Sequence, residues 1–321
     1  MKKYYIGLIL LFIFIIVGCQ SHPDIDQVVN QEKSVKADTK TSETTSEVSS
    51  DNAQVIEPTA YKKIMAVIGS SASVHNQPGD DQKEIAQLNK ETTVNVFEKT
   101  KIEDKTWYHI TLEDGKKGWV SSSEVGIPTS KQLNVKLVSQ LPELPNGCEI
   151  TSLTMLLQSA GVDVDKMTLA DKMKKVPFEE NGLKGDPNEG FVGNMYHGPP
   201  GYAVYHGPVA DLAKQYLKDR VVDLTGSDWS KIEAQIIKGS PVWVIVNVQF
   251  RKLSDGYWED WKTKNGTLKV TMQEHSVLVT GFDKDYVYFN DPLAGVQNRK
   301  AKKSDFKAAW IQQHSQAISY N

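Results

Sequence analysis

The sequence predicts a small all-β barrel followed by a larger α+β domain, and two observations carry this prediction. Between residues 64 and 125, short alternating stretches are separated by turn residues, a pattern typical of β-strands. After residue 131, helical patterns come first and strand patterns follow. Helices segregated before antiparallel strands favour an α+β fold. The chain of 321 residues is long enough for both parts.

The first nineteen residues have the order of an export signal. Lys2 and Lys3 precede an apolar run over residues 4–17, and Gly18 and Cys19 follow. A basic start, a short apolar stretch and a small residue before the cut are typical of a secretory signal. The alternative is an uncleaved membrane anchor, but the run is shorter than the ~20 apolar residues that a spanning helix needs.

The cysteine that follows Gly18 makes this segment resemble a bacterial lipoprotein signal. The resemblance implies that residues 1–18 are the signal peptide and that Cys19 is lipidated. It also implies an extracytoplasmic protein that is lipid-anchored to the bacterial cell membrane. Residues 19–60 are rich in Ser, Thr, Asp, Glu and Lys and almost free of aromatic residues. Such a stretch buries too little apolar surface to offset chain entropy, so we expect a flexible linker.

Residues 61–127 form the predicted barrel. Asp114 and Gly115 form a predicted hairpin turn, and bulky Trp107 and Trp119 are expected to fill the core of so small a barrel. The strands are predicted over residues 65–68, 92–97, 106–111 and 118–120. The segments 107–110 and 115–120 resemble the bacterial SH3-type domain, which implies binding of cell-wall peptides.

Residues 128–321 form the predicted α+β domain. Apolar residues at helical spacing predict a first helix from Cys148 to Ala160, which Gly161 ends. Further helices are predicted over residues 169–175, 209–219, 229–238 and 304–314, and strands over residues 242–248, 275–280 and 286–290. We expect the polar stretch around Trp258 and Trp261 to pack against the barrel, with substrate contact as the alternative.

Cys148 is the cysteine that carries the chemical prediction. Because Cys19 belongs to the signal, Cys148 has no intramolecular disulfide partner, which indicates a reactive thiol or intermolecular pairing. It stands where a Pro/Gly turn stops and a helix begins. The unpaired N–H groups and partial positive charge of a helix start favour the thiolate, which is the nucleophilic form.

His275 and Asp291 are the predicted partners of this thiol. A cysteine hydrolase needs an imidazole within reach of the thiol and a group that orients the imidazole. His275 opens a predicted strand and Asp291 ends the next one, so adjacent antiparallel strands place them side by side. His197 and His206, in a Gly/Pro-rich stretch, are the alternative bases or metal ligands. We expect them to be loop residues that shape a cleft instead, because no Cys/His spacing in this stretch is typical of a zinc site.

Three segments resemble the papain-like family of bacteriocin-exporter (double-glycine) leader peptidases, and in particular its soluble secreted branch. They are residues 147–153, 274–282 and 290–292. The resemblance implies a papain-like fold with Cys148 as nucleophile, His275 as general base and Asp291 as orienting residue. It also implies a glutamine before the cysteine as oxyanion donor, for which Gln140 is the candidate.

Together these observations predict a surface-anchored cysteine peptidase, a thiol hydrolase that cleaves peptide or isopeptide bonds at or near the cell wall. No metal and no organic cofactor is implied. The net charge of −3 and the lack of a basic stripe disfavour nucleic acid as a partner. Two alternatives remain open: a non-catalytic lipoprotein that binds the wall or another protein, and a thiol acyltransferase in which an amine captures the acyl group.

Overall fold

The structure is a computed structural model that describes residues 55–321. The predicted signal peptide at residues 1–18, the lipidation of Cys19 and most of the predicted linker lie outside the described residues. Within residues 55–321, no helix is both long enough and apolar enough to cross a membrane. The end of the predicted linker is wrong in one respect, because residues 55–60 belong to the first strand.

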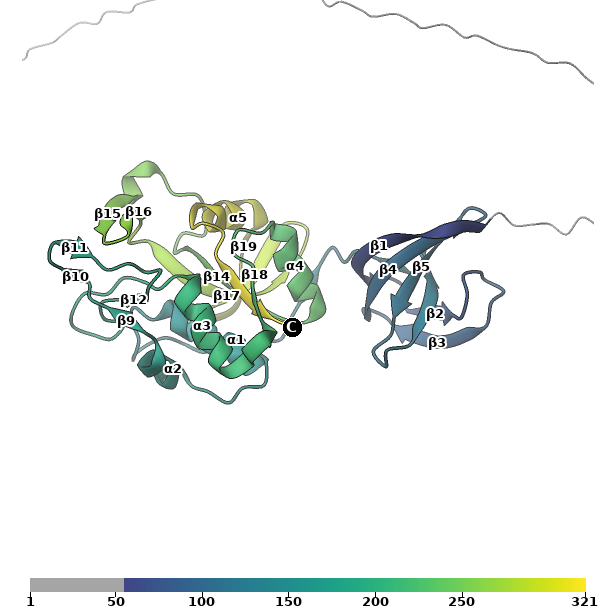
Figure 1. Ribbon diagram of the computed structural model, residues 1–321, viewed down its shortest axis with the longest axis horizontal. Helices are drawn as coiled ribbons and strands as arrows, with labels where there is room; N and C mark the ends of the chain where they lie inside the picture. Colours follow the sequence, from purple (N-terminus) through teal and green to yellow (C-terminus); the bar gives the residue numbers. More distant parts are fainter. Residues whose placement is uncertain (1–54) are drawn as a thin grey trace, which may run out of the picture. The chain divides into compact units, whose positions relative to one another are not determined.

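A seven-stranded antiparallel sheet forms the first part of the described chain (Figure 1). Its strand order is β3-β2-β6-β5-β4-β1-β7. The strands are β1 (Val55–Val67), β2 (Ser71–His75), β3 (Glu84–Asn89), β4 (Thr93–Ile102), β5 (Lys105–Thr111), β6 (Lys117–Ser121) and β7 (Val125–Gly126). Three of them, β2, β3 and β7, were not predicted. β2 and β3 contain few β-branched or aromatic residues, and β7 is only two residues long.

The core of this sheet confirms two sequence predictions. Trp107 and Trp119 are buried, with only 1% and 8% of their surface exposed, so both are core side chains. The turn between β5 and β6 lies at Asp114 and Gly115. Gly115 has φ of +81°, a left-handed conformation that favours glycine, and the Leu112 N–H bonds the Lys116 carbonyl across the hairpin.

The second part is built on a seven-stranded sheet of order β13-β20-β14-β17-β18-β19, with β8 paired to β17. Its strands are β8 (Lys131–Gln132), β13 (Val221–Asp223), β14 (Val242–Asn247), β17 (Glu274–Phe282), β18 (Tyr286–Asp291), β19 (Val296–Lys302) and β20 (Ala317–Tyr320). Its helices are α1 (Cys148–Ser159), α2 (Lys166–Lys172), α3 (His206–Leu217), α4 (Trp229–Lys238) and α5 (Lys303–Gln312). Two short 3-10 helices cover Lys218–Arg220 and Asp255–Tyr257.

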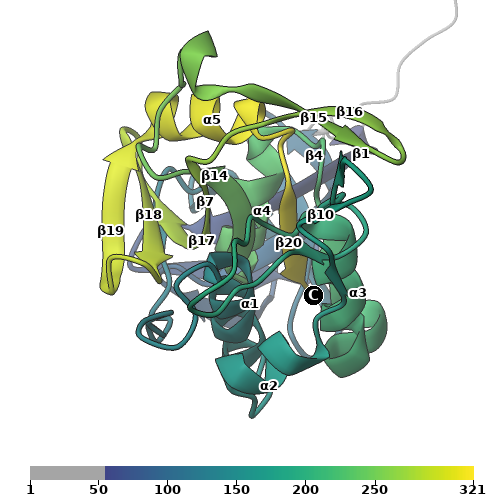
Figure 2. The same ribbon diagram turned by 90° about the vertical axis from the view of Figure 1, so that its left-hand side faces the viewer.

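Helices cover both faces of this sheet. Trp243, Ile245 and Leu278 share one apolar cluster with residues of α1, α2 and α3. The alternate side chains, such as Val244 and Val277, share a second cluster with residues of α4 and α5. Figure 2 shows α5 on one side of β14 and β17, with α1 and α2 on the other. The predicted α+β architecture is confirmed.

Short strands decorate this domain. They are β9 (Lys175–Val176), β10 (Glu179–Glu180), β11 (Leu183–Lys184), β12 (Phe191–Val192), β15 (Glu259–Thr263) and β16 (Gly266–Val270). The hairpin β15–β16 contains Trp261, which is 4% exposed. Its ring lies 4.7 Å from that of Tyr202 and 5.5 Å from that of Phe178. The expectation that Trp261 packs against the barrel is therefore wrong, since both of these aromatic rings belong to its own domain.

Candidate active site

The sheet brings His275 and Asp291 together as the sequence predicted. His275 is the second residue of β17 and Asp291 is the last residue of β18, and these strands pair antiparallel. His275 Nε2 lies 3.0 Å from Asp291 Oδ1, and both side chains are 2% exposed. Because Nε2 is engaged by the carboxylate, Nδ1 is the ring nitrogen left for another group.

Asp291 is held as a carboxylate by several donors. Arg299 Nη1 lies 2.6 Å from Oδ2, and the backbone N–H groups of Leu293 and Ala294 each donate to Oδ1 at 3.1 Å. Burial acts to raise the pKa of Asp291, but the hydrogen bond and charge of His275 oppose it. With help from the Ala294 N–H and Arg299, they lower this pKa to about 2.

Cys148 is the first residue of α1, as predicted. The residue before it, Gly147, is the N-cap and provides no side-chain cap. A Cβ atom at Gly147 would lie 2.7 Å from the Cβ of Leu144, so only glycine fits this approach to the helix. The tight turn buries the thiol, leaving Cys148 only 7% exposed.

In the folded chain, burial opposes the thiolate predicted at Cys148. Burial raises the pKa of the Cys148 thiol well above its usual value, and the carboxyl groups of Glu149 and Glu274 raise it further. The Ser276 backbone N–H acts in the opposite direction. A helix terminus contributes about 0.3–2 kcal/mol, about one pKa unit, whereas full burial shifts a pKa by up to about 3–5 units. Desolvation therefore outweighs the helix dipole.

The hydrogen bonding of the sulfur agrees with a protonated thiol. Cys148 Sγ donates to Glu149 Oε2 at 3.2 Å, and among residues 55–321 this carboxylate, rather than His275, is its side-chain hydrogen-bond partner. The helix is fixed against β17 by Ser152 Oγ, which donates to the Ser276 carbonyl at 3.1 Å. The interaction with the Ser276 N–H places the sulfur beside the residue that follows His275.

The two faces of β17 explain this arrangement. Side chains alternate between the two faces of a strand. Those of Glu274 and Ser276 therefore lie on the same face of β17 as Leu278, which packs with α1. The side chain of His275 lies on the other face of β17, together with Val277, which packs with α4 and α5. Its ring accordingly lies 6.0 Å from that of Phe250.

Gln140 lies next to the Asp291 turn. Its backbone N–H donates to the Pro292 carbonyl at 2.9 Å, and its side chain is buried. Gln140 Nε2 donates to the Pro145 carbonyl at 2.8 Å, while Oε1 has no partner among the described residues. One amide hydrogen of Nε2 is left for another acceptor. The oxyanion role of Gln140 stays a prediction.

Two buried carboxyl groups at this site were missed from the sequence. Glu149 is fully buried, and its Oε1 accepts a hydrogen bond from the Val204 N–H at 2.8 Å. Burial raises its pKa to about 7. Burial and the neighbouring Glu149 raise the pKa of Glu274 well above its usual value. The available signal was position, because Glu149 directly follows Cys148 and Glu274 directly precedes His275.

The alternative histidines have other partners. His206 is the first residue of α3 rather than a loop residue, which corrects the prediction. Its Nδ1 lies 2.8 Å from Asp223 Oδ2 in a partly exposed pair. His197 Nε2 lies 2.9 Å from the Pro142 carbonyl. Neither contact involves Cys148, His275 or Asp291.

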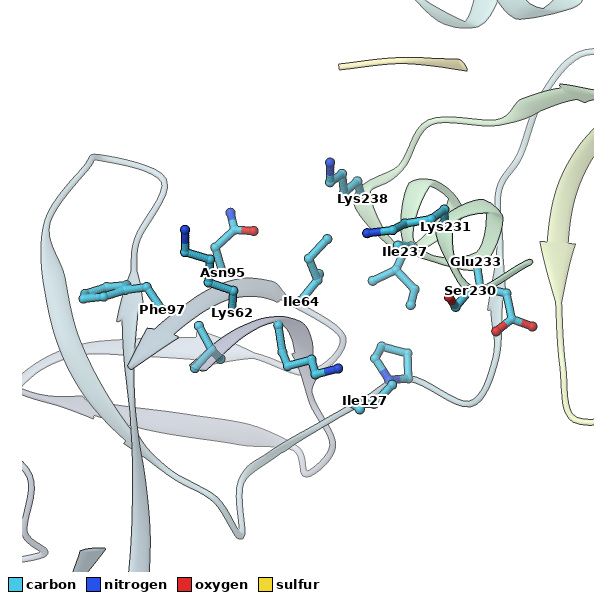
Figure 3. Close-up of a pocket in the computed structure, with 14 residues that line it drawn as sticks. Lys62, Ile64, Asn95, Phe97, Ile127, Ser230, Lys231, Glu233, Ile237 and Lys238 are labelled. Carbon is cyan, nitrogen blue, oxygen red and sulfur yellow. The ribbon is translucent and has the colours of Figure 1, made fainter. Parts of the chain in front are cut away.

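A cavity of about 610 Å³ lies away from these residues. Figure 3 shows Ile64 and Phe97 among its lining residues, together with Lys231 and Ile237 of α4. None of Cys148, His275, Asp291 or Gln140 lines it. We assign it no role in the chemistry.

Comparisons with known proteins agree with this architecture. Residues 132–318 match the Peptidase_C39 like family, and residues 70–126 match the bacterial SH3 domain. The chain is 50% identical over 193 residues to YvpB, an uncharacterised protein of Bacillus subtilis (strain 168), a match that covers 59% of this chain and 76% of that protein.

A solved structure gives the same result. The crystal structure of a C39-like peptidase candidate from Bacillus anthracis is 46% identical, with a TM-score of 0.60. The match covers 60% of this chain and 98% of that chain. The α+β domain with a buried His–Asp pair thus defines a C39-like peptidase fold. The chain belongs to the Peptidase_C39 like family, with a bacterial SH3 domain before the peptidase domain.

Proposed function

We propose that this chain is a cysteine peptidase whose nucleophile is Cys148, general base His275 and orienting residue Asp291. The observation that carries the proposal is the buried pair in which Asp291 Oδ1 holds His275 Nε2 at 3.0 Å. This pair fixes the ring and directs Nδ1 to the proton-transfer role. Membership of the Peptidase_C39 like family supports the same assignment.

The proposed reaction begins with a movement of the sulfur. The thiol leaves Glu149 Oε2, and because Cys148 and His275 lie on opposite faces of β17, a rearrangement at the start of α1 or of β17 is needed to bring Sγ within reach of His275 Nδ1. The thiol proton then passes to Nδ1 as Sγ bonds the substrate carbonyl carbon. The backbone N–H of Cys148 and the free amide hydrogen of Gln140 Nε2 donate to the resulting oxyanion.

Acyl transfer to water completes the cycle. The imidazolium of His275 returns its proton to the leaving amine, which leaves a thioester on Cys148. Asp291 stabilises the imidazolium through Nε2 during this step. His275 then takes a proton from water, the hydroxide attacks the thioester, and the sulfur leaves with the proton.

We propose that the substrate is a peptide or isopeptide in or near the cell wall. The match of residues 70–126 to the bacterial SH3 domain supports this location, because the resemblance to that domain implies binding of wall peptides. A lipid on Cys19 would tether both domains at the outer face of the cell membrane. The linker before residue 55 would set their reach.

The test compares the native protein with Cys148→Ala and Asp291→Asn on a peptide library and purified wall fragments. We expect cleavage by the native protein, none above background by Cys148→Ala, and a large loss in Asp291→Asn. Asp223→Asn is the matched control, because Asp223 holds His206 in a second His–Asp pair. Equal cleavage by the native protein and Cys148→Ala would contradict the proposal.

A further inference from the structure

A compact set of ligand atoms surrounds the sulfur of Cys148. The sulfur and one carboxylate oxygen each from Glu149 and Glu274 all lie within 4.8 Å of one another. Within this set, Sγ and Glu149 Oε2 are 3.2 Å apart. Ligand atoms that bind one tetrahedral ion at about 2.0–2.3 Å are separated from one another by distances of the order seen between Sγ and Glu149 Oε2. A small cation therefore fits among these three atoms.

Buried polar atoms without partners point to a missing ligand at the same place. Glu274 Oε1 and Ser276 Oγ have no hydrogen-bond partner among the described residues. Ser276 is fully buried. Ser276 lies two residues after Glu274 on β17, so their side chains share the face that α1 covers. Leaving such groups unpaired in the interior is unfavourable, and a bound ion relieves part of this cost.

We propose that Cys148 Sγ with the carboxylates of Glu149 and Glu274 binds a thiophilic divalent cation such as Zn²⁺. A thiolate and two carboxylates are suitable ligands for such an ion, and together they carry three negative charges against its two positive ones. Ser276 Oγ or water supplies the fourth position. On binding, the ligand groups that were protonated release their protons to solvent.

The consequence for the enzyme rests on the proposed function. A cation at this position holds the sulfur against Glu149 and Glu274, away from His275. It therefore blocks the nucleophile reversibly, and a chelator restores activity. The binding itself does not depend on whether the chain is a peptidase.

The test is a Co²⁺ titration of the full chain in detergent micelles, followed by near-ultraviolet thiolate-to-cobalt charge-transfer absorption. We expect saturation at a single ion per chain, no such band for Cys148→Ser, and affinity weakened roughly tenfold or more in Glu149→Gln and Glu274→Gln. Glu259→Gln, an exposed residue of β15, is the matched control. No charge-transfer band, or unchanged affinity in both glutamine variants, would overturn the proposal.

A second measurement uses the native protein and so does not depend on the folding of any variant. Zn²⁺ should slow alkylation of Cys148 by iodoacetamide at least tenfold, read by mass spectrometry of the peptide that contains it, and EDTA should restore the rate. Unchanged alkylation in saturating Zn²⁺ would also overturn the proposal. A protein that binds Co²⁺ but cleaves nothing would contradict the proposed peptidase alone.

Discussion

At the scale of single residues, a substitution at Asp291 tests whether its pairing with His275 is catalytic or only structural. Asp291→Asn keeps the shape but loses the charge that stabilises a protonated His275. General base catalysis contributes about 10²–10⁴-fold, so we expect kcat to fall by at least about a hundredfold. The measurement is turnover of a cleaved wall peptide, with Asp223→Asn as control. Full activity in Asp291→Asn would remove this carboxylate from the mechanism.

The raised pKa of the Cys148 thiol predicts slow chemistry in the free protein. Burial comes first among its causes, and the Glu149 and Glu274 carboxyl groups add to it. We therefore expect alkylation at neutral pH to be slower than for the unfolded chain, and to accelerate as the pH rises beyond the range of ordinary thiols. Glu149→Gln, which replaces a carboxylate by an amide donor, should alkylate faster at neutral pH. Fast alkylation of the native protein at neutral pH would contradict this environment.

Glu149 also predicts how stability changes with pH. Its pKa is raised from 4.5 to about 7 by burial. The folded state holds this proton more tightly than the unfolded state, which adds to the free energy of unfolding. This addition is fully present below about pH 4.5 and is lost as the pH rises through about 7. The loss is on the order of 1–3 kcal/mol. We expect the native Tm to fall more between pH 5 and 8 than that of Glu149→Gln, with Glu259→Gln behaving like the native protein. If the Tm of the native protein and the Tm of Glu149→Gln changed in parallel with pH, the raised pKa of Glu149 would be contradicted.

At the scale of elements, the start of α1 depends on Gly147. A methyl group there would lie 2.7 Å from the Leu144 Cβ, and such overpacking costs about 1–3 kcal/mol. Urea unfolding of Gly147→Ala should show this loss. Gly256→Ala is the matched control, because a Cβ at Gly256 meets no atom within 4 Å. Equal stability of both variants would show that the turn before Cys148 relaxes freely.

Periodicity in the sequence predicted the elements that position the site. The helix from Cys148, the stop at Gly161 and the two strands carrying His275 and Asp291 follow from apolar spacing and turn residues. Of the strands in this sheet, β8, β13, β19 and β20 were missed. β19 is rich in Lys, Arg, Gln and Asn and is mostly exposed, and pairing in the sheet rather than local propensity makes it a strand.

The chemistry of the sulfur was not predictable from local sequence. The position of Cys148 at a helix start indicates a thiolate, but burial is a property of the folded chain. Glu149 and Glu274 read as ordinary charged residues next to the candidate catalytic positions. Burial raises the thiol pKa against the expected direction, and the carboxyl oxygens that the sheet and α1 place beside the sulfur raise it further.

At the scale of the whole molecule, the chain joins a bacterial SH3 domain to a C39-like peptidase domain. If the chain acts on a wall polymer as proposed, a wall-binding SH3 domain would raise the local concentration of the catalytic domain at its substrate. If Cys19 is lipidated, Cys19→Ala should move the protein from the membrane fraction to the soluble extracellular fraction. Membrane retention of Cys19→Ala would contradict a lipid anchor at that residue.

The most direct measurement of the central claim is acid-quenched mass spectrometry of the peptide that contains Cys148 during turnover of a wall fragment. The account predicts a thioester on Cys148 that disappears with hydroxylamine and is absent in Cys148→Ala. Product formation with Cys148 unmodified, and at the same rate in Cys148→Ala, would contradict it.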